Sequence, residues 1–187
     1  MRVYGSRLFF SCAVQVIFLG YAIAHIKPIR INQMKLYLMQ HGEAVAKQDD
    51  PQRPLTDKGK SDANRIAVFM RQAGVKVERI IHSGKLRTQQ TADRLVNAIS
   101  PGNKPEASDK INPNDSAVAF YTHCLGWQGD SLIVGHLPFL DHFVAHLITG
   151  NKNAGFTTYT PGTVVCLEYH DDNSWTLNWM MSPELLK

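Results

Sequence analysis

The chain has 187 residues, which is enough for one domain of moderate size with a core that needs neither disulfides nor metals. Hydrophobic residues make up 44% and charged residues 19%, and these values exclude a disordered chain and a fibrous protein. The net charge of +4 comes entirely from the basic residues of 1–33, since Lys plus Arg balances Asp plus Glu in the rest of the chain. The charge therefore gives no indication of nucleic acid as a partner.

The first 33 residues form a segment that differs from the rest. Residues 8–26 are apolar and carry no Lys, Arg, Asp or Glu, and two arginines precede them. Three interpretations stay open: a signal peptide cut after Ala24, an N-terminal membrane anchor, or a wrongly assigned start, with translation beginning at Met34. We treat 1–33 as a leader and predict one domain over 34–187. We expect that domain to be cytoplasmic, with export or membrane attachment as the alternative if the leader is real.

Strand and helix patterns alternate along the domain. The first half is expected to contain a strand over 35–39, a helix from an N-cap at Thr56 to Gln72, a strand over 77–82 and a helix over 86–99. The second half is expected to contain a short strand near Ala107, a helix over 116–124, a buried strand over 131–135, a helix over 138–148 and β segments over 163–169 and 175–179. This order predicts a three-layer α/β/α sandwich with a mainly parallel sheet.

Side chains that can bind and transfer phosphate follow several of the predicted strands. His41 and His136 come directly after two strands, and Arg53 and Arg87 lie in the loops and helix beside them. Sites in parallel sheets form at the carboxyl ends of the strands, so these residues are expected to meet in one crevice. A guanidinium matches two phosphate oxygens, and a neutral imidazole can attack phosphorus. The sequence thus predicts a pocket for a phosphoryl dianion.

Four motifs in chain order carry a family resemblance. They are HGE at 41–43, RPLTxxG at 53–59, SxxxRxxQTA at 83–92 and GH at 135–136. Together they resemble the histidine phosphatase superfamily, which has a phosphoglycerate mutase-like fold. The lack of an inserted helical cap is similar to the short SixA-type phosphohistidine phosphatases. The resemblance covers residues 34 to about 183 and implies an enzyme without a metal or other cofactor.

The resemblance implies a role for each motif residue. His41 would be the nucleophile that is phosphorylated, and Arg87 and His136 would hold the phosphoryl oxygens. Arg53 would close the pocket or contact the substrate. Ser83 would bind substrate or fix the loop that carries Arg87.

Two positions depart from the family pattern. Gln40 stands where the family usually has Arg, and the loss of one charge-assisted contact is worth about 1–2 kcal/mol, or about tenfold in rate. Gly84 stands where Pro usually follows the serine, which loosens a turn without removing a chemical group. Gly42 is expected to let the backbone pass close behind the nucleophile, and Gln40 can still donate a hydrogen bond to phosphate.

The resemblance also narrows the substrate. Members that cleave phosphate esters use a carboxylic acid under a cap, whereas Glu43 is the only candidate acid near the nucleophile here. Imidazole is a better leaving group than an alkoxide, so phosphohistidine needs less acid assistance. We therefore expect a phosphatase acting on a phosphohistidine-containing phosphorelay or phosphotransfer protein. The alternatives are a broad phosphomonoesterase on small phosphate esters and a non-catalytic module that binds phosphate or a phosphoprotein.

Overall fold

The structure is a computed structural model that describes residues 34–155 and 157–186. The leader assigned to 1–33 lies outside the described residues. Across the described ranges, no helix combines the length and the apolar character needed to cross a bilayer.

The centre of the domain is a six-stranded mixed sheet in the order β3-β2-β4-β1-β5-β6. The strands are β1 (Lys35–Gln40), β2 (Arg79–His82), β3 (Glu106–Ala107), β4 (Ser131–Gly135), β5 (Val164–Tyr169) and β6 (Trp175–Met181). The pairs from β3 to β1 are parallel, and β5 and β6 add an antiparallel hairpin beyond β1. The expected parallel sheet is thus correct for the half that contains β1, β2 and β4, whose carboxyl ends share one edge.

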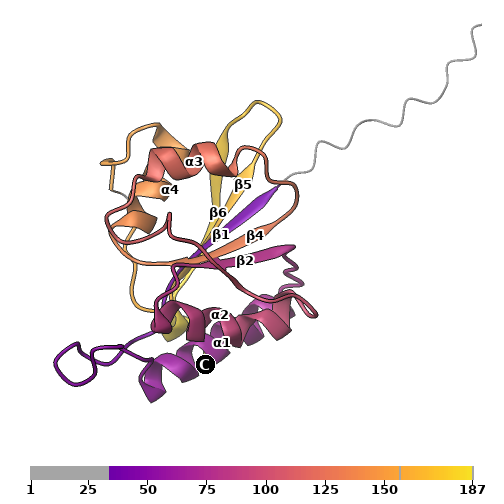
Figure 1. Ribbon diagram of the computed structural model, residues 1–187. Helices are drawn as coiled ribbons and strands as arrows, with labels where there is room; N and C mark the ends of the chain where they lie inside the picture. The colour runs from indigo at the N-terminus through magenta and orange to yellow at the C-terminus, as the bar shows by residue number, and fades with distance from the viewer. Residues whose placement is uncertain (1–33, 156, 187) are drawn as a thin grey trace, which may run out of the picture. The chain divides into compact units, whose positions relative to one another are not determined.

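Helices cover both faces of this sheet and complete the predicted three-layer sandwich. In Figure 1, α1 (Asp57–Gln72) and α2 (Leu86–Ile99) lie on one face, and α3 (Ala117–Cys124) and α4 (Phe139–Thr149) lie on the other. Alternation along β1 explains this division, because successive side chains of a strand point to opposite faces. Tyr37 and Met39 pack in the cluster with α1 and α2, and Leu36 and Leu38 pack in the cluster with α3 and α4.

The N-terminus of α1 is tied to the loop that follows β1. Thr56 is the N-cap, as the sequence predicts: its hydroxyl oxygen accepts the Gly59 N–H at 3.0 Å. The same hydroxyl donates to the Glu43 carboxylate at 2.7 Å, and the Thr56 N–H donates to the Glu43 carbonyl at 3.0 Å. A short 3₁₀ helix at Pro183–Leu185, which the sequence patterns did not predict, packs against α1.

Gly59, in the first turn of α1, packs closely against the backbone of Glu43. Ala normally favours a helix over Gly by about 1 kcal/mol, but a Cβ at position 59 would overlap the backbone of Glu43. We expect Gly59→Ala to lower the free energy of unfolding by about 2 kcal/mol, the usual size of overpacking at a close contact. Denaturant unfolding measures this change. Gly126→Ala is the control, since a Cβ there meets nothing within 4 Å, and equal stability of the two variants would contradict the close packing.

Candidate active site

The candidate site lies at the carboxyl edge of the parallel strands. His41 directly follows β1, Ser83 directly follows β2 and His136 directly follows β4. Because β4 pairs with both β1 and β2, the three strand ends are neighbours. Arg87 is the second residue of α2, four positions after Ser83, and the tight turn at Gly84 (φ 76°) leads the chain into that helix. The structure therefore brings together four residues that the sequence proposed for one site.

The ring of His41 has a defined tautomer. Its Nδ1 lies 2.7 Å from the carbonyl oxygen of Gly42, which can only accept, so Nδ1 carries the proton. Its Nε2 lies 3.1 Å from Nε of Arg87, which can only donate, so Nε2 presents a lone pair. An imidazole in this state has its nucleophilic nitrogen directed at a guanidinium. That arrangement fits a nucleophile beside an anion-binding group.

Burial keeps this imidazole neutral. Desolvation lowers the pKa of His41 to about 4, and the positive charges of Arg87 and Arg53 act in the same direction. The hydrogen bond to the Gly42 carbonyl opposes them by favouring the protonated form. At neutral pH the Nε2 atom of His41 is therefore free to attack an electrophile without first losing a proton.

His136 is held against the same guanidinium. The residue is only 3% exposed, and its ring centroid lies 5.0 Å from that of His41. Nη2 of Arg87 lies 3.4 Å from Nδ1 of His136. Burial lowers the pKa of His136 to about 3, and the charges of His41 and Arg87 add to this. One arginine thus spans two neutral imidazoles, and an incoming phosphoryl dianion would favour a proton on His136 that could be donated to it.

A chain of hydroxyl groups fixes the orientation of His136. Its Nε2 lies 2.6 Å from Oγ of Ser83, which lies 3.0 Å from Oγ1 of Thr88. The Thr88 hydroxyl donates to the backbone carbonyl of Lys85 at 2.7 Å, so Ser83 donates to Thr88 and accepts from His136. Nδ1 of His136 is then the nitrogen that faces Arg87. The sequence proposed Ser83 for substrate binding or for fixing the loop that carries Arg87. In the structure its hydroxyl contacts His136 and Thr88 and so positions the ring of His136.

The other predicted residues lie around this cluster. Gly42 donates its N–H to Oγ1 of Thr91 at 3.1 Å, and a Cβ on Gly42 would lie 2.8 Å from the carbonyl oxygen of Gly59. The expected close passage of the backbone behind the nucleophile is present. Gln40 is the last residue of β1, and its Oε1 is buried without a hydrogen-bond partner in the described part of the chain.

Arg53 and Glu43 lie outside the hydrogen-bonded cluster. Arg53 has a left-handed backbone (φ 52°), and its Nε donates to the carbonyl of Val45 at 3.1 Å. It lines a cleft of about 540 Å³ together with Arg87, so it borders the site rather than filling it. The carboxylate of Glu43 accepts from the Thr56 hydroxyl, and no hydrogen bond joins it to His41 or Arg87 among the described residues.

Two residues of the SxxxRxxQTA motif have roles that spacing alone did not reveal. Thr91 donates its hydroxyl to the Arg87 carbonyl at 2.8 Å while it accepts the Gly42 N–H, and so links α2 to the loop after β1. Gln90 accepts the N–H of Leu55 at 2.7 Å through Oε1. Their presence in the motif was the available signal. Their partners become visible only when the loop after β1 is placed beside α2.

The site also predicts how stability depends on pH. His41 and His136 have pKa values of about 4 and about 3 in the folded protein, against about 6.5 in an unfolded chain. The unfolded state therefore binds more protons between pH 6.5 and 4, and the free energy of unfolding falls as the pH falls through this range. We expect a lower Tm at pH 4.5 than at pH 7, and a smaller drop in the double variant His41→Asn/His136→Asn. An equal drop in both proteins would contradict the neutral imidazoles.

A neutral imidazole, a guanidinium and a second imidazole at one sheet edge form an arrangement that can bind a phosphoryl group and accept it on nitrogen. In the part of the chain that the structure describes, no three His, Cys, Asp or Glu side chains are grouped to hold a metal ion. The family model of the histidine phosphatase superfamily (branch 1) matches residues 36–110. The chain belongs to the histidine phosphatase superfamily.

Individual relatives extend this match over most of the chain. The phosphohistidine phosphatase SixA of Escherichia coli (strain K12) is 28% identical over 159 residues, which is 82% of this chain and 97% of that protein. An uncharacterized protein of Picosynechococcus sp. is 30% identical over 167 residues, with 82% of this chain and 99% of that protein covered. The solved structure of the protein histidine phosphatase SixA complexed with tungstate matches with a TM-score of 0.71 and 27% identity, over 82% of this chain and all of that one. These similarities support phosphatase activity and confirm the predicted fold class.

Proposed function

We propose that this protein is a phosphatase that removes the phosphoryl group from phosphohistidine in a protein substrate. The observation that carries the proposal is the contact between Nε2 of His41 and Nε of Arg87, because a neutral imidazole nitrogen able to attack phosphorus then lies against a guanidinium able to bind phosphoryl oxygens. The similarity to a phosphohistidine phosphatase over nearly its whole length supports the substrate class.

The reaction divides into two displacements on phosphorus. In the first, a bond forms between phosphorus and Nε2 of His41 while the bond to the substrate imidazole nitrogen breaks, and the leaving nitrogen takes a proton from solvent. In the second, water attacks phospho-His41, the phosphorus–nitrogen bond breaks, and inorganic phosphate leaves with one proton released. Arg87 holds charge on the phosphoryl oxygens in both transition states, and His136 donates a hydrogen bond to them.

The position of Glu43 favours phosphohistidine over phosphate esters. An alkoxide leaving group needs a positioned acid, whereas an imidazole with a conjugate-acid pKa of about 6.5 leaves readily near neutral pH. The Glu43 carboxylate is already bound to the hydroxyl that caps α1, and so it supports the helix rather than the leaving group. Between Arg87 and His136 the described chain forms the rest of α2 and then β3, α3 and β4, with no inserted helical cap in this segment, and this supports access for a histidine on another protein.

The test compares substrates in one assay on the full chain. A phosphotransfer domain phosphorylated on histidine is mixed with excess enzyme beside a sugar phosphate and para-nitrophenyl phosphate. We expect release of phosphate from the protein with kcat/KM at least about 100-fold above that for the sugar phosphate, the factor typical of one missing acid catalyst. The nitrophenyl ester, whose phenolate leaves without an acid, is the control for phosphoryl transfer that needs none. Glu43→Gln should leave the phosphohistidine rate within about twofold, and its stability is checked because Glu43 binds Thr56.

Two outcomes would overturn the proposal. Faster turnover of the sugar phosphate, with an acid limb that disappears in Glu43→Gln, would make the protein a broad phosphomonoesterase. Binding of the phosphorylated domain without release of phosphate would make it a phosphoprotein-binding module.

A further inference from the structure

A positively charged cleft adjoins the candidate site, and of its lining residues only Arg87 takes part in the proposed chemistry. Its volume is about 540 Å³, and it lies between the loop after β1 and the start of α2. Four of its lining side chains are cations: Lys47, Arg53, Lys85 and Arg87. Among the described residues that line it there is no Asp or Glu. Arg87 belongs both to this cleft and to the His41 site, so the two are continuous.

Hydrogen bonds within the loop after β1 hold this wall of the cleft in place. The N–H of Val45 donates to the carbonyl of Pro54 at 2.8 Å, and Ala44 and Leu55 form an antiparallel bridge. The N–H of Arg53 donates to the carbonyl of Asp50 at 3.0 Å, and its guanidinium donates to the carbonyl of Val45. The two sides of the loop are therefore bonded to each other, and this fixes the backbone that carries Lys47 and Arg53.

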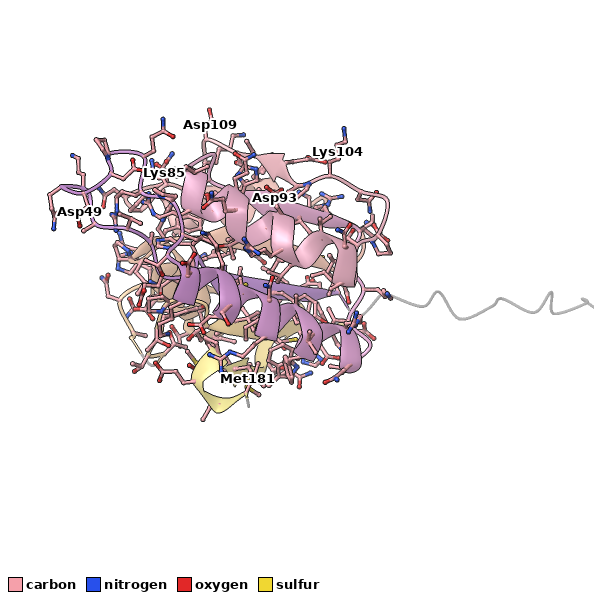
Figure 2. The ribbon with its side chains drawn as sticks, turned by 90° about the horizontal axis from the view of Figure 1, so that it is seen from below. Asp49, Lys85, Asp93, Lys104, Asp109 and Met181 are labelled. Carbon is pink, nitrogen blue, oxygen red and sulfur yellow. The ribbon has the colours of Figure 1, made fainter. Side chains whose placement is uncertain are left out.

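Among the described residues, none of the four cations of the cleft forms a salt bridge with an acid. Asp49 and Asp50 lie on the same loop but do not line the cleft, and the Asp50 carboxylate accepts the Gln52 N–H at 2.8 Å. Lys85 is half-buried at the N-cap of α2, and Figure 2 shows it at the same end of the domain as Asp49. Burial lowers the pKa of Arg87, and the positive charge of Arg53 lowers it further.

We propose that this cleft binds acidic side chains that flank the phosphohistidine on the partner protein. The inference rests on the proposed function, because the phosphoryl group must occupy the His41 site for its neighbours to reach the cleft. Charge complementarity carries it: one phosphoryl dianion at His41 and Arg87 leaves Lys47, Arg53 and Lys85 to be neutralised. Asp or Glu residues beside the phosphohistidine supply the negative charges that pair with these cations. Such charge pairing speeds association and discriminates among partner proteins.

The experiment uses two synthetic phosphohistidine peptides of equal length. One carries Asp and Glu around the phosphohistidine, and the other carries Asn and Gln at the same positions. The test variant of the full chain is Lys47→Gln/Lys85→Gln, which keeps the backbone carbonyl of Lys85. The control is Lys76→Gln/Lys104→Gln, which removes the same charge from exposed lysines that follow α1 and α2 at the other ends of these helices. Figure 2 shows Lys104 at the opposite end of α2 from Lys85.

The expected result is a selective change in KM. At low salt the kcat/KM of the wild type should be about tenfold higher for the acidic peptide than for the neutral one. Lys47→Gln/Lys85→Gln should lower this ratio about fivefold, by raising KM for the acidic peptide. The control variant should keep the wild-type preference. At 0.5 M NaCl the preference should largely disappear, since the screening length falls to a few ångströms.

Binding to the His41→Ala protein separates this inference from the proposed function. The dissociation constants of both peptides are measured on that background, with and without the lysine substitutions. Tighter binding of the acidic peptide that depends on Lys47 and Lys85 supports the cleft, even if the wild type releases no phosphate. If both peptides are hydrolysed at equal rates and have equal dissociation constants, the cleft does not bind acidic side chains, whereas the proposed phosphatase function still holds. Equal effects of the lysine substitutions on both peptides overturn the binding of acidic side chains as well, because they indicate attraction of the phosphoryl group alone.

Discussion

His41→Ala is expected to lower the rate of phosphohistidine hydrolysis by at least about a thousandfold and to abolish the phosphoenzyme. The variant keeps Arg87 and His136, so it should still bind a phosphorylated substrate while it lacks the nitrogen that attacks phosphorus. Rapid quenching at alkaline pH, which preserves phosphohistidine, followed by phosphate analysis of the protein measures the intermediate.

The control for this experiment is His123→Asn, which removes an exposed imidazole on α3 that packs beside Phe120 and Trp127. It should form the phosphoenzyme at the wild-type rate. A phosphoenzyme in His41→Ala would show that another side chain is the nucleophile. A loss of activity in both variants, accompanied by a lowered Tm, would point to unfolding instead.

Arg87→Lys is expected to lower kcat by about 100-fold, the usual effect of removing an oriented donor to a transition-state oxyanion. The guanidinium reaches Nε2 of His41 through Nε and Nδ1 of His136 through Nη2, and the single ammonium of lysine cannot occupy both places. The positive charge is kept, so the pKa of His41 should stay low and the acid limb of the pH–rate profile should not move. A lowered kcat with an unmoved acid limb would show that the site depends on the two oriented contacts of the guanidinium and not on its charge alone.

Arg94→Lys is the matched control, since it makes the same exchange two turns further along α2, where the guanidinium contacts Asn64 at 3.3 Å. Its kcat should stay within about twofold of the wild type. If Arg87→Lys were equally active, the site would need only a positive charge. Arg87→Gln should shift the acid limb to higher pH, because the loss of a cation beside His41 raises the pKa of its imidazole.

The sequence predicted those parts of the fold that depend on local patterns. The N-cap at Thr56 and the bounds of α2 follow from spacing and capping chemistry, which act within a few residues. The strand order could not be derived in the same way, since β1 pairs with β4 and β5, which lie far along the chain. The antiparallel hairpin of β5 and β6 was expected only as two β segments, because their direction relative to β1 is not a local property.

In the candidate site too, the sequence predicted the residues but not the contacts between distant segments. His41, Arg87 and His136 could be identified from residue type and their position after strands. The link from Ser83 to His136 could not, because it joins residues of two strand ends through a 2.6 Å contact. Glu43 was proposed as an acid from its nearness in sequence to His41. The structure instead binds its carboxylate to the hydroxyl of Thr56, a partner that depends on where α1 begins.

The central place of β1 has a consequence for how the protein is made. Synthesis proceeds from the N-terminus, so the nucleophile leaves the ribosome long before β4 and β5, the strands on either side of β1. Until then the apolar segment Leu36–Met39 has no sheet neighbours, and α1 and α2, which are made before β4, can cover only the face that carries Tyr37 and Met39. Leu36 and Leu38 stay exposed until α3 and α4 emerge, and transiently exposed apolar surface of this kind favours aggregation. His136, the second imidazole, also emerges late. The two imidazoles of the site can therefore meet only after β4 has been made, when most of the chain has left the ribosome.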